Sequence, residues 1–252
     1  MKISVVIITW NEAHIIGNTL KSLQGVTDDI VIVDSGSTDD TISICKKFST
    51  AIIETGWDGY GMNKNKGIAA AKNDWILNLD ADEAVDGELK EALLLLDLQE
   101  EDIVYEAQFK NFFCNKWIRF GEWSGDKHIR LFNRKKIQWN DAAVHESLVL
   151  TAGIQKRSLK GNILHYTSNS IDDHINKTIA YAKLNAEKYF SQGKRAGFFK
   201  LWLAPGFTFI QHYLLLLGFL DGWEGYFIAR TTAWYTFLKY SYLKEMNKKM
   251  TV

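Results

Sequence analysis

The first hundred residues alternate between short apolar runs and longer segments whose apolar positions recur at helical spacing. Four runs are expected to be strands, the first apolar enough to be buried on both faces: Ile3–Thr9, Ile30–Val33, Ala51–Glu54 and Trp75–Leu79. Three helices are expected between them: one carries Ile16, Leu20 and Leu23, one follows a capping box formed by Ser37 and Asp40, and one runs from Gly61 to Lys72. This alternation predicts an α/β fold with a mostly parallel sheet flanked by helices.

Polar residues follow three of these strands directly. Asn11 and Glu12 come after the first strand, Asp34 and Ser35 after the second, and residues 80–83 after the fourth. In open α/β sheets, ligands bind at the carboxyl ends of the parallel strands. We therefore expect the binding site at this edge of the sheet.

The pattern changes after about residue 100. Ile103–Phe109 alternates like a half-buried strand, and aromatic and basic residues interleave as far as Phe132. A capping box from Ser170 to Asp173 predicts the start of a helix, and the aromatic-rich residues from Phe198 to Tyr242 are expected to be mostly helical. We predict one α/β domain over residues 1–165, with halves 1–100 and 101–165, and a helical extension over 166–252.

Composition narrows the class of protein. The 30 basic and 30 acidic residues give a formal net charge of zero, so no overall field attracts nucleic acid, and we expect no such partner. The two cysteines, Cys45 and Cys114, lie far apart and form no CxxC pair, which favours a reducing, cytoplasmic location.

Asp80 and Asp82 are the first candidates for chemistry. Two carboxylates one residue apart, emerging from a buried strand, are expected to point at the same ion once the chain turns. Hard divalent cations prefer oxygen ligands and keep room for phosphate oxygens of a substrate. Such an ion stabilises the charge that builds on a departing diphosphate. The alternative is a solvated acidic turn.

Asp34, Lys64 and Asn65 are candidates for contact with a nucleotide. At a strand end, Asp34 is placed to accept a hydrogen bond from a uracil-like base or a ribose hydroxyl. Lys64 and Asn65 lie on a helix between two glycines, from which they reach a base or phosphates. A plain surface helix explains these last two residues nearly as well.

Three segments resemble the markers of family 2 inverting glycosyltransferases, in that family's order and at about its spacing: Ser4–Glu12, Val31–Asp39 and Asn78–Glu83. The resemblance covers roughly the first 150 residues. It implies a GT-A (Rossmann-like) fold, a nucleoside-diphosphate-sugar donor, expected to be a UDP-sugar, and Mg²⁺ or Mn²⁺ as cofactor. It also implies that residues 1–100 are the nucleotide-binding half of the domain and 101–165 the acceptor half. The residues expected to contact the donor, including the two on the third helix, are Thr9, Asn11, Glu12, Asp34, Ser35, Lys64, Asn65, Asp80 and Ala81.

Within that family the chain looks most similar to lipopolysaccharide-core glucosyltransferases that act on inner-core heptose. This closer likeness rests on three segments: Asp34–Gly36, Val144–Glu146 and Leu220–Gly225. It implies transfer of a glucose-like sugar to a lipopolysaccharide-core or other cell-envelope glycan or glycolipid.

An inverting transfer needs a carboxylate that takes the proton from the acceptor hydroxyl. Asp126 lies in a segment (GDKHIR, residues 125–130) that resembles the family's catalytic Glu-Asp segment, although Gly125 stands where the family usually has an acid. Glu146 is the second candidate, and His145 beside it is the expected third metal ligand. Asp126 is favoured, and Glu146 remains open.

The remaining candidates concern the acceptor. Trp123 is expected to stack on a sugar, and Arg130 to hold a phosphate or an acceptor anion; the alternatives are core packing and simple solvation. The basic, aromatic C-terminal helices suit either peripheral contact with the inner face of the membrane or packing against protein. Leu201–Leu220 lacks charge and is about long enough to span a bilayer, but Pro205 and Gly206 interrupt it.

Two other functions are weighed. A sugar-phosphate nucleotidyltransferase would show a glycine-rich phosphate loop with arginine after the first strand, where Thr9–Glu12 stands instead. A non-catalytic sugar-nucleotide-binding protein would not need Asp80, Asp82 and an acid near residue 126 together.

Overall fold

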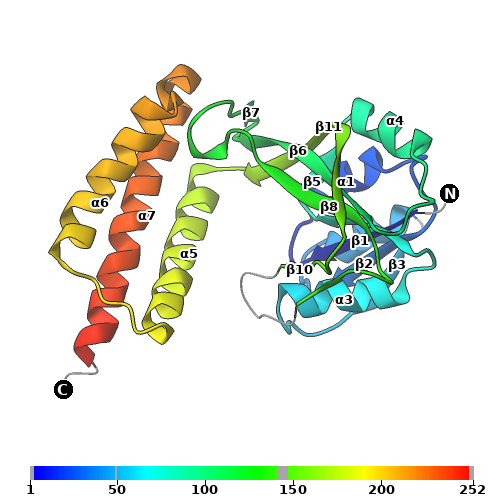
Figure 1. Cartoon of the computed structure of the whole chain (residues 1–252), viewed down its shortest axis with the longest axis horizontal. Coiled ribbons are helices and arrows are strands. Elements are labelled where there is room, and N and C mark those ends of the chain that lie inside the picture. The colour runs from blue at the N-terminus through cyan, green and yellow to red at the C-terminus, as the bar shows by residue number, and fades with distance from the viewer. Residues whose placement is uncertain (1–2, 49, 141–146, 250–252) are drawn as a thin grey trace. The chain divides into compact units, whose positions relative to one another are not determined.

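The computed structural model describes residues 3–48, 50–140 and 147–249. The chain divides into two compact units (Figure 1). The first, here called the sheet unit, comprises residues 1–109 and 126–165. The second, the helical unit, comprises residues 110–125 and 166–252. Each unit is described by itself.

Four parallel strands form one half of the main sheet, in the order β3 (Ala51–Glu54), β2 (Ile30–Asp34), β1 (Ile3–Thr9) and β4 (Trp75–Asp80). They match the four predicted strands to within one residue at each end. Their apolar, β-branched composition fits this position, because helices cover both faces of a parallel sheet. The predicted α/β class is confirmed.

Antiparallel strands extend the sheet beyond β4, in the order β8 (Lys127–Asn133), β6 (Ile103–Phe113), β11 (Gln155–Ser168) and β5 (Glu83–Val85). The short β7 (Lys116–Trp117) pairs with the end of β6, and β9 (Gln138–Trp139) pairs with β10 (Leu148–Val149). β5 follows β4 after a two-residue turn. Residues 80–83 therefore connect the parallel half of the sheet to a strand of the antiparallel half.

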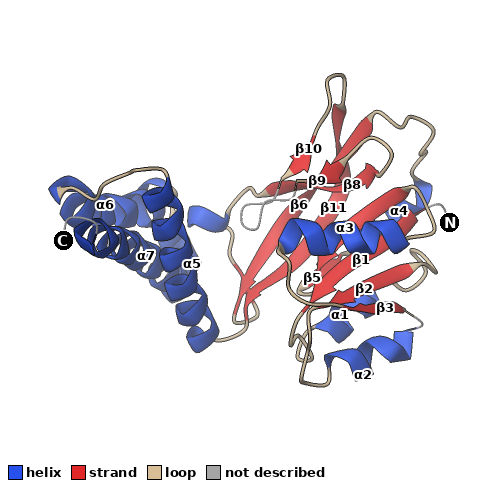
Figure 2. Ribbon diagram, turned by 90° about the horizontal axis from the view of Figure 1, so that it is seen from below, coloured by secondary structure: helices blue, strands red, loops and turns tan. Residues whose placement is uncertain are grey.

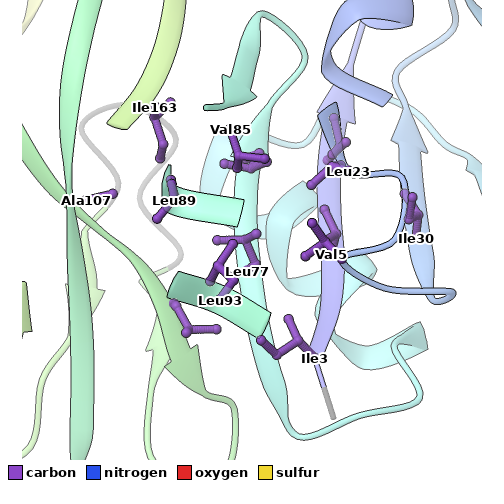
Figure 3. Packing of buried hydrophobic residues seen from close by; sticks show 14 of the residues in the cluster. Ile3, Val5, Leu23, Ile30, Leu77, Val85, Leu89, Leu93, Ala107 and Ile163 are labelled. Atoms are coloured by element: carbon purple, nitrogen blue, oxygen red, sulfur yellow. The ribbon is translucent and has the colours of Figure 1, made fainter. Parts of the chain in front are cut away.

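Helices cover the two faces of the parallel half (Figure 2). One face packs Ile3, Val5 and Ile7 of β1 against α1 (Ile16–Ser22), α2 (Thr41–Cys45) and α4 (Gly87–Leu95), as Figure 3 shows for part of this cluster. The other face packs Val6 against α3 (Tyr60–Ala70). Alternate side chains of one strand therefore enter two cores, as the period of a strand requires.

The start of α2 corrects one prediction. The capping box from Ser37 to Asp40 does not form, and the helix begins at Thr41, followed by a 3₁₀ turn over Lys46–Phe48. Ser37 instead donates its hydroxyl proton to the Asp34 carboxylate, and Asp39 accepts hydrogen bonds from the Thr41 N–H and hydroxyl. The Asp34 carboxylate therefore takes both the N–H and the hydroxyl of Ser37, which the predicted box needed.

The helical unit contains three longer helices: α5 (Ile171–Ser191), α6 (Phe198–Ile210) and α7 (Gly222–Lys249). Ser170 caps α5 by accepting a hydrogen bond from the Asp173 N–H, which confirms the predicted start of this helix, while the Asp173 carboxylate accepts from the Asn169 N–H. A π-helical turn (η3, Gln211–Leu215) and a 3₁₀ turn (η4, Gly218–Asp221) connect α6 to α7, and a short 3₁₀ turn (η2, Gly121–Trp123) precedes β8 in the chain. The aromatic-rich helical extension is thus present as expected.

Taken singly, the described helices are all too short or too polar to cross a membrane. Residues 198–215 and 218–249 meet the criteria of length and composition only as a pair, with a bend of 69° between them.

Candidate active site

The carboxyl ends of β1, β2 and β4 lie side by side. Parallel register pairs Thr9 with Asp34 and Ile8 with Asp80, so the predicted polar clusters meet at one edge of the sheet. The buried hydroxyl of Thr9 has no hydrogen-bond partner within the described part of the chain. Buried polar atoms are seldom left unpaired in proteins, so an unpaired hydroxyl here fits a site that a ligand completes.

Asp34 organises the loop that follows β2. Its buried carboxylate accepts hydrogen bonds from the N–H groups of Gly36 and Ser37, at 3.0 and 2.8 Å, and from the Ser37 hydroxyl at 2.5 Å. The Ser37 hydroxyl also accepts from the Asn11 N–H at 2.8 Å, and the Glu12 N–H donates to a threonine hydroxyl of α2. The loops after β1 and β2 are therefore joined through Asp34, whose contact with a nucleoside stays a prediction.

Three consecutive polar residues of α3 have different surroundings. Asn63 donates its amide to the Ser35 hydroxyl at 3.0 Å, while its buried carbonyl oxygen lacks a partner among the described residues. Asn65 exchanges two hydrogen bonds with the backbone of Trp139 and so holds β9 against α3. Lys64 is buried, with 3% of its side chain exposed, and its Nζ lies 3.3 Å from Asp80 Oδ1. Of these three residues, only Asn63 was not among the predicted donor contacts.

Asp80 lies between two cations. Besides Lys64, the Arg130 guanidinium lies 3.6 Å from Asp80 Oδ2, and 35% of the Asp80 side chain is exposed. Burial raises the pKa of the Asp80 carboxyl, but the charges of Lys64, Arg130 and His165 outweigh it and bring the pKa down to about 2. Asp80 is therefore ionised at neutral pH, and its carboxylate faces a concentration of positive charge.

Arg130 is held by Glu83 at the start of β5. The guanidinium donates two hydrogen bonds to the Glu83 carboxylate, at 3.0 and 2.5 Å, and Glu83 Oε2 also accepts from the Asp80 N–H at 3.1 Å. Burial lowers the pKa of Arg130, but Glu83 and Asp80 outweigh it and raise the pKa. Such a two-pronged contact fixes the plane of the guanidinium. The structure thus links Asp80 to β8 and β5.

Asp82 faces a different strand. Its carboxylate lies 3.5 Å from His165 Nε2, and β11 brings His165 opposite Glu83. Burial lowers the pKa of His165, but the hydrogen bond and charge of Asp82, followed by the charges of Glu83 and Asp80, raise it overall. His165 was not among the predicted site residues, because nothing in its local pattern marks it and only the pairing of β11 with β5 brings it here.

A cavity of about 430 Å³ opens beside the Asp80 cluster within the sheet unit. Its lining includes Lys64, Asp80, Arg130, Trp139 and Glu106, together with His128 and basic residues of β8 and β11. The volume lies in the range of small-ligand sites. The lining combines two carboxylates with four lysine and arginine side chains, and this excess of positive charge suits a phosphorylated ligand.

The predicted base and acceptor residues are not all brought to this cavity. Asp126 lies directly before β8, where its backbone oxygen accepts from the Phe109 N–H, and it is not part of the cavity lining. Glu146 and His145 lie outside the described residues. Trp123 belongs to the helical unit, and Arg130 is a buried residue of the sheet unit. The base therefore remains a prediction.

The carboxylates suit a divalent cation by their chemistry. Asp80 and Asp82 supply oxygen ligands of the kind that Mg²⁺ and Mn²⁺ prefer, and the predicted third ligand, His145, lies outside the described residues. Within residues 3–48, 50–140 and 147–249, no group of three or more His, Cys, Asp or Glu side chains is arranged to hold a metal ion. A metal site shared by Asp80 and Asp82 therefore stays a prediction.

The site defines an α/β protein whose charged residues gather at the carboxyl ends of parallel strands. At the same edge, the carbonyl oxygen of Ala81 accepts a hydrogen bond from a threonine hydroxyl of α1. Residues 4–158 match the family described as glycosyl transferase family 2, and the chain belongs to that family. Its fold is the GT-A fold expected from the resemblance.

Known proteins are similar over most of the chain. An uncharacterized glycosyltransferase of Rickettsia typhi is 29% identical and covers 98% of this chain and 88% of its own. The lipopolysaccharide core biosynthesis glycosyltransferase LpsC of Rhizobium meliloti is 29% identical over 94% of this chain and 90% of its own. Among solved structures, S. aureus TarS 1-349 in complex with UDP-GlcNAc covers 99% of this chain and 92% of its own, at 16% identity and a TM-score of 0.48.

The pairing of Glu83 with Arg130 predicts a large effect on stability. Arg130→Met should lower the free energy of unfolding by about 3–5 kcal/mol, because it leaves the Glu83 carboxylate, only 1% exposed, without its countercharge. Urea denaturation followed by circular dichroism measures the change. Arg157→Met is the matched control, since the exposed Arg157–Glu100 pair should contribute about 0–1 kcal/mol. Equal losses in the two variants would contradict this account.

Proposed function

We propose that this member of glycosyl transferase family 2 is an inverting enzyme that transfers a glucose-like sugar from a UDP-sugar to a lipopolysaccharide-core or other cell-envelope glycan. The observation that supports it most is the position of Asp80 at the strand ends, between Lys64 and Arg130 and beside a cavity. The similarity to LpsC supports the class of acceptor. Membership of a glycosyltransferase family argues against a sugar-phosphate nucleotidyltransferase.

The donor would bind along the edge formed by β1, β2 and β4. Loops joined by Asp34 would hold the nucleoside, with the Thr9 hydroxyl and the Asn63 carbonyl oxygen as polar groups ready to pair with it. Lys64 and Arg130 would place positive charge next to the diphosphate. Because both cations are buried and held by carboxylates, they are set before the substrate arrives, as electrostatic stabilisation requires.

Asp80 and Asp82 would hold Mg²⁺ or Mn²⁺, which stabilises the negative charge on the leaving diphosphate. In the transfer, the acceptor oxygen forms a bond to the anomeric carbon while the bond from that carbon to the diphosphate breaks. The acceptor proton goes to a carboxylate, and UDP leaves with the bonding electrons. Asp126 is the favoured base and Glu146 the alternative.

The donor half of this mechanism predicts hydrolysis of a UDP-sugar in the presence of Mn²⁺. Asp82→Asn should lower kcat/KM by about 100-fold or more, because an amide is a poorer metal ligand than a carboxylate and the diphosphate charge would then be balanced by Lys64 and Arg130 alone. Release of UDP from a panel of UDP-sugars measures the rate. Asp102→Asn, at an exposed site beside Lys136, is the control and should leave the rate unchanged. Absence of turnover with every donor would refute the proposed function.

We further propose that the enzyme works at the inner face of the membrane, held there by α6, the turns after it and the start of α7. This segment exposes thirteen large apolar side chains by 41% to 71%: Phe198, Phe199, Trp202, Leu203, Phe207, Ile210, Leu214, Leu215, Leu216, Leu217, Phe219, Leu220 and Trp223. An apolar surface of this size is rare on a monomer that stays in water. Exposed Lys194, Arg195 and Lys200 adjoin its start, so anionic lipid headgroups fit the charge as well.

Vesicle flotation tests this surface. The full chain should float with phosphatidylglycerol-containing vesicles, and the double variant Trp202→Ser, Phe207→Ser should lose most of that binding, because it removes two exposed aromatic side chains. Leu95→Ser removes an 86% exposed leucine from α4 of the sheet unit and should float like the parent protein. A chain that stays out of the vesicle fraction, or that instead forms dimers in solution, would contradict membrane contact.

A further inference from the structure

The helical unit contains a cavity of its own. Its volume is about 370 Å³, within the range of small-molecule sites, and its described lining comes from α5, α7, the turn at residues 121–123 and the end of β11. All of these segments belong to the helical unit, so the cavity does not depend on the sheet unit.

The walls combine aromatic rings with groups that exchange hydrogen bonds. Trp123, Tyr181 and Tyr235 contribute the rings, while Asn185 and Thr178 contribute an amide and a hydroxyl. Aromatic rings offer flat apolar area, and tyrosine adds a hydroxyl at its edge. Amide and hydroxyl groups both donate and accept hydrogen bonds. A ligand with one apolar face and several hydroxyl groups matches such a lining.

The two charged side chains of the described lining, Glu122 and Lys177, both interact with other groups of the protein. Glu122 accepts a hydrogen bond from the Thr232 hydroxyl at 2.7 Å. Lys177 donates to the Thr167 carbonyl at 3.0 Å and lies 3.1 Å from the Asp173 carboxylate, one turn earlier in α5. A ligand that carries a phosphate or a carboxylate needs a cation to pair with, and Lys177 already lies beside the Asp173 carboxylate. The lining therefore favours a neutral ligand.

The floor of the cavity is polar and held in place. His174 Nε2 lies 2.9 Å from the Thr231 hydroxyl, and His174 Nδ1 lies 3.3 Å from the Ser168 hydroxyl. Ser168 and Thr231 are buried, and Thr231 also donates toward the α7 backbone. Burial lowers the pKa of His174, which keeps the ring neutral at neutral pH. A hydrogen-bonded floor of this kind binds a ligand without first having to become ordered.

We infer that this cavity binds one neutral sugar residue of the acceptor glycan, apart from the residue that receives the new bond. The inference rests on the proposed function for the identity of the glycan. Trp123 and Tyr181 would stack on the sugar ring, and Asn185, Thr178 and the His174 floor would meet its hydroxyl groups. The helical unit then selects the acceptor while the sheet unit binds the donor.

Saturation-transfer-difference NMR on the full chain tests this site directly. The probes are the methyl glycosides of glucose, mannose and a heptose, with glucose 6-phosphate as the charged comparison. At least one neutral glycoside should receive saturation. The double variant Tyr181→Ala, Asn185→Ala should weaken its binding about tenfold or more, because it removes a ring and an amide from the wall.

Leu184→Ala is the matched control, since Leu184 is exposed on the same helix but does not line the cavity. It should bind the glycoside like the parent protein. No binding of any neutral glycoside, equal loss in the control, or tighter binding of glucose 6-phosphate would overturn the inference.

A thermal shift with UDP in the same variants should be unchanged. No glycoside binding by the parent protein, together with an intact response to UDP, would refute this site alone, whereas glycoside binding without any response to UDP would support it and count against the proposed donor.

Discussion

The buried contact between Glu83 and Arg130 is the interaction on which the site depends. It joins the start of β5 to the middle of β8, and the same carboxylate accepts a hydrogen bond from the Asp80 N–H. Asp80 is thereby fixed at the end of β4 with Arg130 on one side and Lys64 on the other. Buried charges are stable only where each has a close countercharge, so none of these side chains can be exchanged singly without cost.

This arrangement explains why both halves of the sheet are needed. The parallel half brings the ends of β1, β2 and β4 together, which places Asp34 and Asp80 at one edge. The antiparallel half supplies Arg130, which lies beside Asp80, and His165, which lies beside Asp82. A carboxylate pair on the parallel half alone would be a solvated acidic turn. The strands beyond β4 convert it into a preset cluster beside a cavity.

How much of this structure the sequence predicts depends on how far apart the interacting residues lie along the chain. The four parallel strands and the caps of long helices are local patterns, and Ile3–Thr9 and Ser170 were correctly interpreted. The partners Glu83–Arg130 and Asp82–His165 are separated by dozens of residues, and only strand pairing makes them neighbours. The capping box at Ser37 failed for a local reason instead, because the side chain of Asp34, three residues earlier at the end of β2, takes its hydroxyl.

Calorimetric titration of UDP into the full chain, with and without Mn²⁺, tests most directly whether the carboxylates and their cations together hold a metal–diphosphate. UDP should bind at least about tenfold more tightly with Mn²⁺, and Asp82→Asn should remove that gain while keeping the weaker, metal-free binding that Lys64 and Arg130 support. The same affinity for UDP with and without Mn²⁺, or no binding in either case, would contradict it.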